Sequence, residues 1–196
     1  MQSAYVRAIL WGLVAGFVVG VLIGFVYHDA PGSRMPLYCG AFAGVLTAYL
    51  KANLAGNRKI AAASDADKHA ALTRTPPPGK ALLFLYRTGF VAKLAGMNIG
   101  VDGKIVAQLK APRFTCVVVS AGKHTLKASF GGLAGPQTRV AEAEVATPAD
   151  RIVVVRFTVG LGVVQNRPDI VVMPAGADSL IPLQGMAMIP PDAAEV

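Results

Sequence analysis

The strongest pattern in the sequence is a run without charged residues from Ala8 to Tyr27. Roughly 20 apolar residues, at about 1.5 Å of helix per residue, cross the ~30 Å hydrocarbon core of a bilayer. A second apolar run covers residues 35–50, and it becomes long enough to cross if the helix continues past Lys51. The pattern therefore predicts two transmembrane helices, over about residues 8–27 and 35–53, joined by a polar loop.

Glycines recur at every fourth position of the first span, at Gly12, Gly16, Gly20 and Gly24, and the second span repeats the spacing at Gly40 and Gly44. This spacing places the glycines on one helix face, a glycine zipper, where another helix backbone can approach closely. Two interpretations stay open. The two helices of one chain pack on each other, or the stripe packs against other subunits.

The pattern changes after residue 79, where short β-rich runs replace the helical spacing. Asp102-Gly103 is the best hairpin signal between them. In the run 124–130 every second residue is apolar, which is typical of a sheet with one face in water, whereas the run 114–120 is apolar on both faces. The eight predicted strands cover residues 81–88, 97–101, 105–109, 114–120, 124–130, 139–145, 152–159 and 170–173.

These patterns predict an α+β membrane protein in which a two-helix transmembrane hairpin precedes an antiparallel, immunoglobulin-like β-sandwich. Residues 1–56 form the hairpin and residues 80–175 form the sandwich. Residues 57–79 are an Ala/Pro-rich linker whose three consecutive prolines favour a stiff spacer that holds the soluble domain off the membrane. Residues 176–196 are an extended C-terminal tail.

The net charge of +8 is concentrated in the middle of the chain. Residues 51–139 carry 14 Lys or Arg against three Asp, whereas residues 140–196 carry three Arg against seven acids. This distribution suits an anionic lipid surface or an acidic partner better than a nucleic acid, and a solvated basic face is the simplest alternative. The predicted docking cations follow the second span and are Lys51, Arg58, Lys59 and Lys68.

Positive charges near the span ends also predict the orientation. They lie before the first span and after the second, and only Arg34 lies between the spans. Both termini and the β-domain are therefore predicted to be cytoplasmic. A signal peptide is the competing interpretation of the first span, but the run is long and no convincing cleavage site follows it.

Three segments of the β-region resemble the bacterial DUF2846 and PEGA-like β-domains. They are the Tyr86-Arg87 start, the Val101-Asp102-Gly103-Lys104 hairpin and the Gly122-Lys123-His124 turn. The resemblance implies a β-sandwich in the bacterial envelope, here at the inner membrane, and no settled activity. Ala121 stands where the family usually has Pro, and Cys39 lacks the sequence context of a lipoprotein anchor.

Candidate chemistry is sparse. No two of the three histidines have the spacing of metal ligands, and His124 is interpreted as a turn-capping residue. Glu142 and Glu144 alternate on one strand face, where a solvated surface is a simpler explanation than glycoside chemistry. The run Gly160-Leu161-Gly162 lacks the further glycine or lysine of a phosphate loop. The sequence predicts no catalytic residue, no metal and no cofactor.

Three functions follow from these expectations. The leading one is a non-catalytic accessory subunit whose hairpin packs into a larger membrane protein complex. The second is a membrane-tethered binding module in which the sandwich recognises a peptide, a glycan or a lipid headgroup. The third is self-association through the glycine stripe, although the spans lack the polar lining of a channel.

Overall fold

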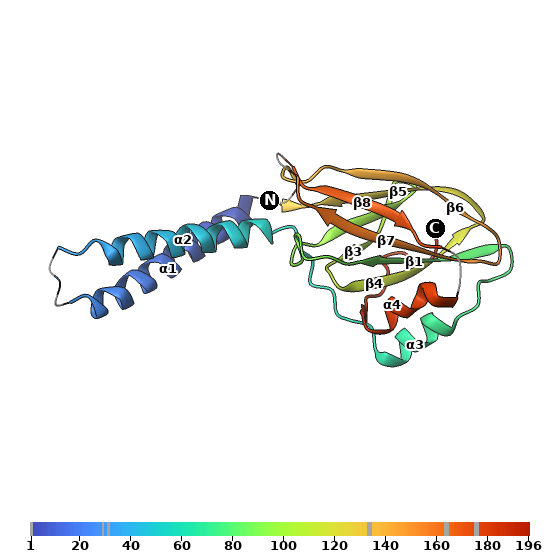
Figure 1. Ribbon diagram of the computed structural model, residues 1–196, viewed down its shortest axis with the longest axis horizontal. Coiled ribbons are helices and arrows are strands. Elements are labelled where there is room, and N and C mark those ends of the chain that lie inside the picture. Colours follow the sequence, from blue (N-terminus) through green and yellow to red (C-terminus); the bar gives the residue numbers. More distant parts are fainter. Residues whose placement is uncertain (1, 29, 31, 133–134, 163–164, 175–176) are drawn as a thin grey trace. The chain divides into compact units, whose positions relative to one another are not determined.

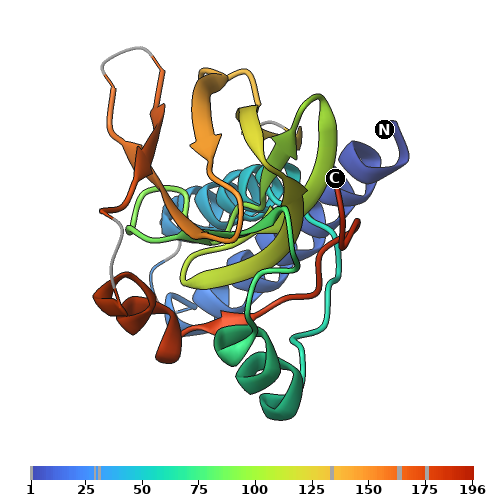
Figure 2. The same cartoon turned by 90° about the vertical axis from the view of Figure 1, so that its right-hand side faces the viewer.

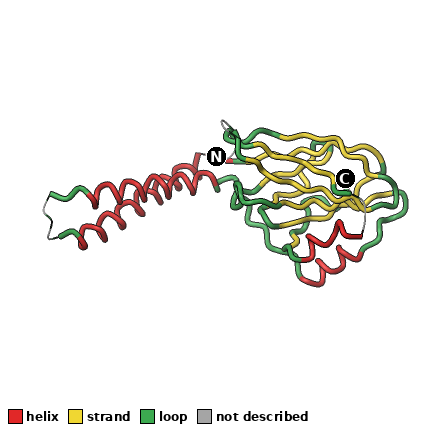
Figure 3. The backbone as a smooth tube through the Cα atoms, in the orientation of Figure 1, coloured by secondary structure: helices red, strands yellow, loops and turns green. Residues whose placement is uncertain are grey.

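The computed structural model describes residues 2–28, 30, 32–132, 135–162, 165–174 and 177–196. The chain divides into two compact units, a helical unit (Met1–Ala55) and a sheet unit (Gly56–Val196). Figure 3 shows that the first unit is built from helices and that strands dominate the second. An α+β architecture is thereby confirmed.

The helical unit consists of α1 (Gln2–Val26) and α2 (Met35–Asn53), which run in opposite directions (Figure 1). Of the described helices, α1 alone is long and apolar enough to cross a membrane, over Ala4–Val26. The second predicted span forms a helix of 19 residues, with a proline in its first turn and Lys51 in its last, but it does not reach the same length and apolarity. Pro31 of the predicted loop lies outside the described residues.

The sheet unit is a two-layered sandwich. One sheet has the strand order β8-β7-β1-β4-β9 and the other has the order β3-β2-β5-β6. Each of the eight predicted runs overlaps one of the first eight strands, and only the two-residue β9 has no predicted counterpart. The strands are β1 (Lys80–Arg87), β2 (Met97–Val101), β3 (Lys104–Leu109), β4 (Arg113–Ser120), β5 (Gly122–Phe130), β6 (Ala141–Thr147), β7 (Ile152–Gly160), β8 (Arg167–Val172) and β9 (Ala187–Met188).

The sandwich is mixed, and the prediction of a wholly antiparallel one is wrong in the first sheet. β1 pairs with β7 in parallel, and β4 pairs with β9 in parallel. The chain crosses from β6 in one sheet to β7 in the other, and Asp150 N donates to Lys80 O at 2.8 Å where β1 begins. β7 therefore starts at the same end as β1 and must run alongside it in the same direction.

Strand alternation decides which face of each sheet is buried. In β5, the residues from His124 to Phe130 alternate between buried and more exposed positions, and the buried ones join the core between the sheets. β4 is buried on both faces, as its continuous apolar run predicts, and β1 is buried on both faces as well. A second apolar cluster therefore forms on the outer face of the first sheet, around Phe84 and Phe114.

Parts of the predicted linker and tail cover this outer face, which corrects their assignment as a spacer and an extended tail. Residues 57–79 belong to the sheet unit and contain α3 (Asp65–Thr73), which Ser64 caps by accepting a hydrogen bond from Asp67 N. Residues 177–196 contain the 3₁₀ helix η2 (Ala177–Leu180), α4 (Ile181–Gln184) and β9. Figures 1 and 2 show α3 and α4 on the same side of the sandwich. A sheet that is apolar on both faces needs such a cover to exclude water.

Candidate functional site

The two helices of the helical unit meet through their glycines. A Cβ placed on Gly12 would lie 2.7 Å from the Gly44 carbonyl oxygen, and one on Gly16 would lie 2.8 Å from the Gly40 carbonyl oxygen. Backbone atoms cannot rotate away as a side chain can, so these positions fit only glycine at the observed helix separation. Around Gly24, by contrast, nothing lies within 4 Å of a Cβ position. The stripe thus packs within one chain, and Gly24 is left out of the contact.

A groove of about 640 Å³ lies along the same helix pair. Its fourteen lining residues are all apolar, and they include the paired glycines together with larger side chains from both helices. Phe17 and Val45 in this lining are 74% and 71% exposed. Phe42 is as exposed, at 70%, but it does not line the groove. The helical unit therefore offers an apolar concave face as well as ordinary apolar helix surface.

The four predicted docking cations, Lys51, Arg58, Lys59 and Lys68, belong to two different units, and two of them bond to the C-terminal segment. Lys51 belongs to α2 in the helical unit, whereas the other three belong to the sheet unit. Arg58 forms an ion pair of 2.5 Å with Asp192, and the ammonium of Lys68 donates to the Gln184 carbonyl oxygen at 2.6 Å. Two of the four cations therefore bind the C-terminal segment to the predicted linker within the sheet unit.

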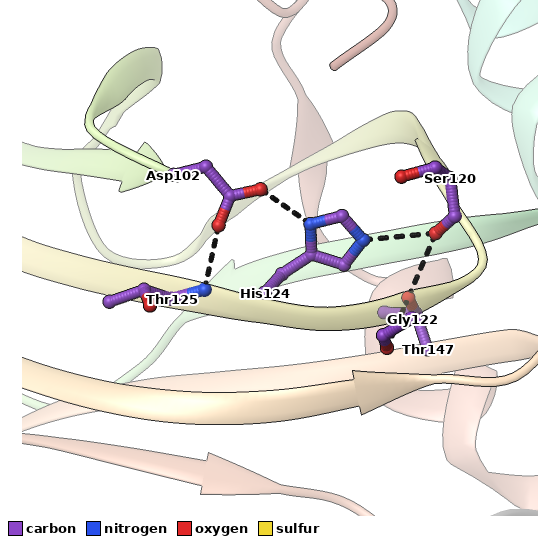
Figure 4. Close-up of polar contacts among 6 residues, drawn as sticks. All are labelled: Asp102, Ser120, Gly122, His124, Thr125 and Thr147. Atoms are coloured by element: carbon purple, nitrogen blue, oxygen red, sulfur yellow. Dashed lines mark hydrogen bonds and ion pairs between the residues drawn. The ribbon is translucent and has the colours of Figure 1, made fainter.

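The hairpin and turn residues of the family resemblance converge on one hydrogen-bond network (Figure 4). Asp102 and Gly103 form the two-residue turn between β2 and β3, both with positive φ, of 49° and 81°. One carboxylate oxygen of Asp102 lies 2.6 Å from His124 Nδ1, and the other accepts from Thr125 N at 2.8 Å. His124 Nε2 lies 2.9 Å from the Ser120 carbonyl oxygen. The network ties the β2–β3 turn to the β4–β5 turn.

The electrostatics of this network favour a charged histidine. A carboxylate and a carbonyl oxygen can only accept, so both ring nitrogens of His124 donate. Burial lowers the pKa of His124, but its hydrogen bonds to Asp102 and Ser120 and the charge of Asp102 outweigh burial and raise the pKa above its ordinary value of 6.5. The hydrogen bonds from His124 and from the Thr125 N–H lower the pKa of Asp102. With both nitrogens engaged, His124 has no free position for proton transfer to a substrate.

Arg87, the second residue of the Tyr-Arg pair, is fully buried. One terminal nitrogen, Nη1, donates to the carbonyl oxygens of Ala95 and Leu109, the latter at 3.0 Å, and Nη2 donates to those of Ala92, at 2.7 Å, and Val91. Burial lowers the pKa of Arg87 to about 10, which still leaves it protonated at neutral pH. The guanidinium therefore gathers the main chain of the loop between β1 and β2.

The other candidate reactive groups are engaged or shielded. Glu142 pairs with Lys127 at 2.7 Å, and Glu144 pairs with Lys123 at 2.8 Å, across β5 and β6. Burial raises the pKa of the Cys116 thiol to about 12. The described residues contain no group of three or more His, Cys, Asp or Glu that could hold a metal ion. Part of the run compared with a phosphate loop, residues 163–164, lies outside the described residues.

A further polar cluster, around Gln108, was not predicted. Gln108 is 5% exposed, and its side-chain amide donates to the Gly56 carbonyl oxygen at 2.9 Å and to Asn98 at 2.8 Å, while it accepts from Arg58 N. Asn57 donates to the Leu94 carbonyl oxygen at 2.8 Å. These bonds fix the first residues of the sheet unit. The sequence feature that could have indicated this cluster is a glutamine inside the otherwise apolar run 105–109.

The fold and these clusters define a class of protein, a β-sandwich that follows an apolar helix pair. No known protein-family model matches the chain, and no curated protein matches it significantly. The resemblance to DUF2846 and PEGA-like domains therefore stays a prediction. What the structure adds is that the resembling residues, from Tyr86 to His124, serve the packing and turns of the sandwich.

Proposed function

We propose that the chain is a non-catalytic accessory subunit of a bacterial inner-membrane protein complex. In this proposal α1 and α2 both cross the bilayer as a hairpin, and the sheet unit lies on the cytoplasmic side. The hairpin packs into the complex, and the sheet unit provides a folded domain at the membrane surface. The observation that carries the proposal is the apolar groove along α1 and α2.

The surface of α2 supports placing it in lipid beside α1. Leu37, Phe42 and Val45 are between 67% and 71% exposed, and in water such apolar surface would be costly to leave uncovered. The close glycine contact keeps α2 against α1 along most of its length. Both helices then share one apolar environment, and Lys51 at the end of α2 can extend its ammonium to the headgroups.

The groove supports a helical partner over simple contact with lipid. Apolar helices gain little from burial in a bilayer, because lipid tails are as apolar as leucine, so association there depends on close packing. A concave surface made of small residues, with Phe17 and Val45 among its exposed members, allows the backbone of a third helix to approach closely. Arg87 and His124 already form hydrogen bonds within the sheet unit, so we assign them structural roles there.

The test is a pulldown of the tagged full chain from native membranes in mild detergent. The unchanged chain should co-purify with stoichiometric membrane subunits. Phe17→Ala should lose them, whereas Phe42→Ala, matched in residue type and exposure but outside the groove, should retain them. Recovery of the chain alone, or equal retention by both variants, would contradict the proposal. Recovery of only a second, differently tagged copy would assign the groove to self-association instead.

A further inference from the structure

One end of the sandwich carries the point at which the chain enters the sheet unit. β1 and β7 end there, because they run in parallel, and β5 ends there opposite the start of β2. Gly56 lies against the glycines that directly follow β5. This end of the sheet unit, called the Gly56 end below, therefore carries four loops, residues 88–96, 110–112, 131–140 and 161–166, of which the structure describes all but residues 133–134 and 163–164.

The four loops have an unusual composition for a water-exposed surface. Their sequences contain three cations, Lys93, Lys110 and Arg139, and no Asp or Glu. Among their described residues, Phe90 is 88% exposed and Leu161 is 83% exposed. The turns at the opposite end differ, since they contain acidic residues such as Asp102 and Asp150. The Gly56 end thus combines protruding apolar side chains with positive charge.

These loops are held by specific bonds. Arg87 draws the carbonyl groups of the loop 88–96 inward, so that its Phe90 and Leu94 side chains are left exposed, at 88% and 65%. The loops 131–140 and 161–166 are joined by backbone bonds, among them Arg139 N to Asn166 O at 3.0 Å. Exposure of the apolar side chains is therefore a property of the folded loops.

The chain enters this end of the sheet unit within a few residues of the end of α2. The Leu94 carbonyl oxygen accepts a hydrogen bond from Asn57, which is four residues after Asn53, the last residue of α2. Four residues span at most about 14 Å. If α2 ends at the membrane surface, as the proposed function requires, Asn57 lies at most about 14 Å from that surface, and the loop 88–96 lies next to Asn57.

We infer that the Gly56 end is a docking surface for an anionic bilayer, and this inference rests on the membrane hairpin of the proposed function. Phe90 and Leu94 enter the boundary between headgroups and acyl chains, where apolar side chains of peripheral proteins commonly insert. Lys93, Lys110 and Arg139 bind lipid phosphates. At an anionic surface each cation raises the population of the docked state about fivefold. The docked sandwich then presents its opposite, acid-containing end to the cytoplasm.

The test places a single tryptophan at each end of the sheet unit in the full chain. Trp11 is the one native tryptophan and is replaced by Phe, after which Phe90→Trp reports on the Gly56 end and Lys104→Trp on the opposite end. Both chains are placed in nanodiscs whose anionic lipids carry bromine on the acyl chains. Emission from Phe90→Trp should fall relative to unbrominated nanodiscs, because a side chain inserted at the boundary between headgroups and acyl chains lies close to the bromine atoms. Emission from Lys104→Trp should not change.

The charge requirement has its own control. The quenching of Phe90→Trp should be strong in brominated phosphatidylglycerol and weak in phosphatidylcholine that carries the same amount of bromine on its acyl chains. Combining Lys93→Glu with Arg139→Glu should remove that difference, whereas Lys104→Glu with Arg151→Glu, at the other end, should preserve it. No quenching at Phe90 in either lipid would overturn the inference, and so would equal quenching at both ends. Retention of the chain in the nanodisc tests the membrane hairpin separately, and the pulldown tests membership of a complex. Failure of the docking inference can therefore be distinguished from failure of the proposed function.

Discussion

Replacing single glycines of α1 by alanine should separate the helix contact from helix propensity. Gly16 and Gly24 lie two turns apart on the same stripe, but they differ in surroundings. A Cβ on Gly16 would lie 2.8 Å from the Gly40 carbonyl oxygen, whereas one on Gly24 would meet nothing within 4 Å. We expect Gly16→Ala to destabilise the helical unit and Gly24→Ala to leave it unchanged or more stable.

The magnitudes follow from two opposing effects. Alanine improves helix propensity by about 1 kcal/mol over glycine at either position. At Gly16 the new methyl group overpacks the contact, which costs about 1–3 kcal/mol because the helices must move apart. The net change is a loss of up to about 2 kcal/mol for Gly16→Ala and a gain of up to about 1 kcal/mol for Gly24→Ala. The two variants should therefore differ by about 2 kcal/mol, or roughly 30-fold in the unfolding equilibrium.

Trp11 provides the assay, because the Lys51 ammonium lies 4.9 Å from the centre of its ring across the helix pair. Purified chain in mild detergent is titrated with sodium dodecyl sulfate, and the emission of this one tryptophan gives the free energy of unfolding of the helical unit. Equal midpoints for Gly16→Ala and Gly24→Ala would refute the packing of α1 on α2 through this face.

Three further predictions concern the sheet unit and are measured by thermal or urea unfolding. Arg87→Lys should cost about 2–4 kcal/mol, because a lysine cannot bind the same carbonyl groups on two sides and leaves buried acceptors unpaired; an unchanged midpoint would contradict that role. The raised pKa of His124 adds stability that is complete below pH 6.5 and lost as the pH rises through the folded-state value, while the lowered pKa of Asp102 adds stability above pH 3.8 that is lost on acidification. His124→Gln should therefore destabilise most between about pH 4 and 6.5 and progressively less as the pH rises through the folded-state pKa of His124, and a pH-independent difference would contradict the charged pair. Leu183→Ala should cost about 2–5 kcal/mol and Ile181→Ala under about 0.5 kcal/mol, since Leu183 is fully buried and Ile181 is 56% exposed; equal, small effects would mean that the C-terminal segment does not pack.

Local chemistry explains which features were predictable. The alternation in β5 and the Asp102-Gly103 turn are set by side chains within a few residues, so the burial and the positive φ angles agree with the sequence pattern. The direction of β7 depends on which strand it meets after a crossover. Because that partner, β1, lies about seventy residues earlier, the local sequence of β7 does not indicate that the two strands pair in parallel.

The candidate sites, too, were predictable where they depend on local sequence and not where they depend on long-range contacts. Tyr86, Arg87, Asp102 and His124 are visible as a motif. The partners of Arg87 are main-chain carbonyl groups, and Asp102 and His124 bind each other across distant turns, contacts that only folding assembles. The buried role of Gln108 and the docking of the C-terminal segment through Leu183 depend on the same long-range contacts.

The sequence by itself determined an apolar helix able to span a membrane and a β-rich region, because length, hydropathy and alternation act through local geometry. It also determined the glycine spacing, which makes a close helix contact possible. Only the tertiary structure decided that α2 occupies that contact, that residues 57–79 and the tail cover the first sheet, and that apolar and basic loops share the end at Gly56. These outcomes depend on which surfaces meet, and burial is optimised over the whole fold rather than along any one segment.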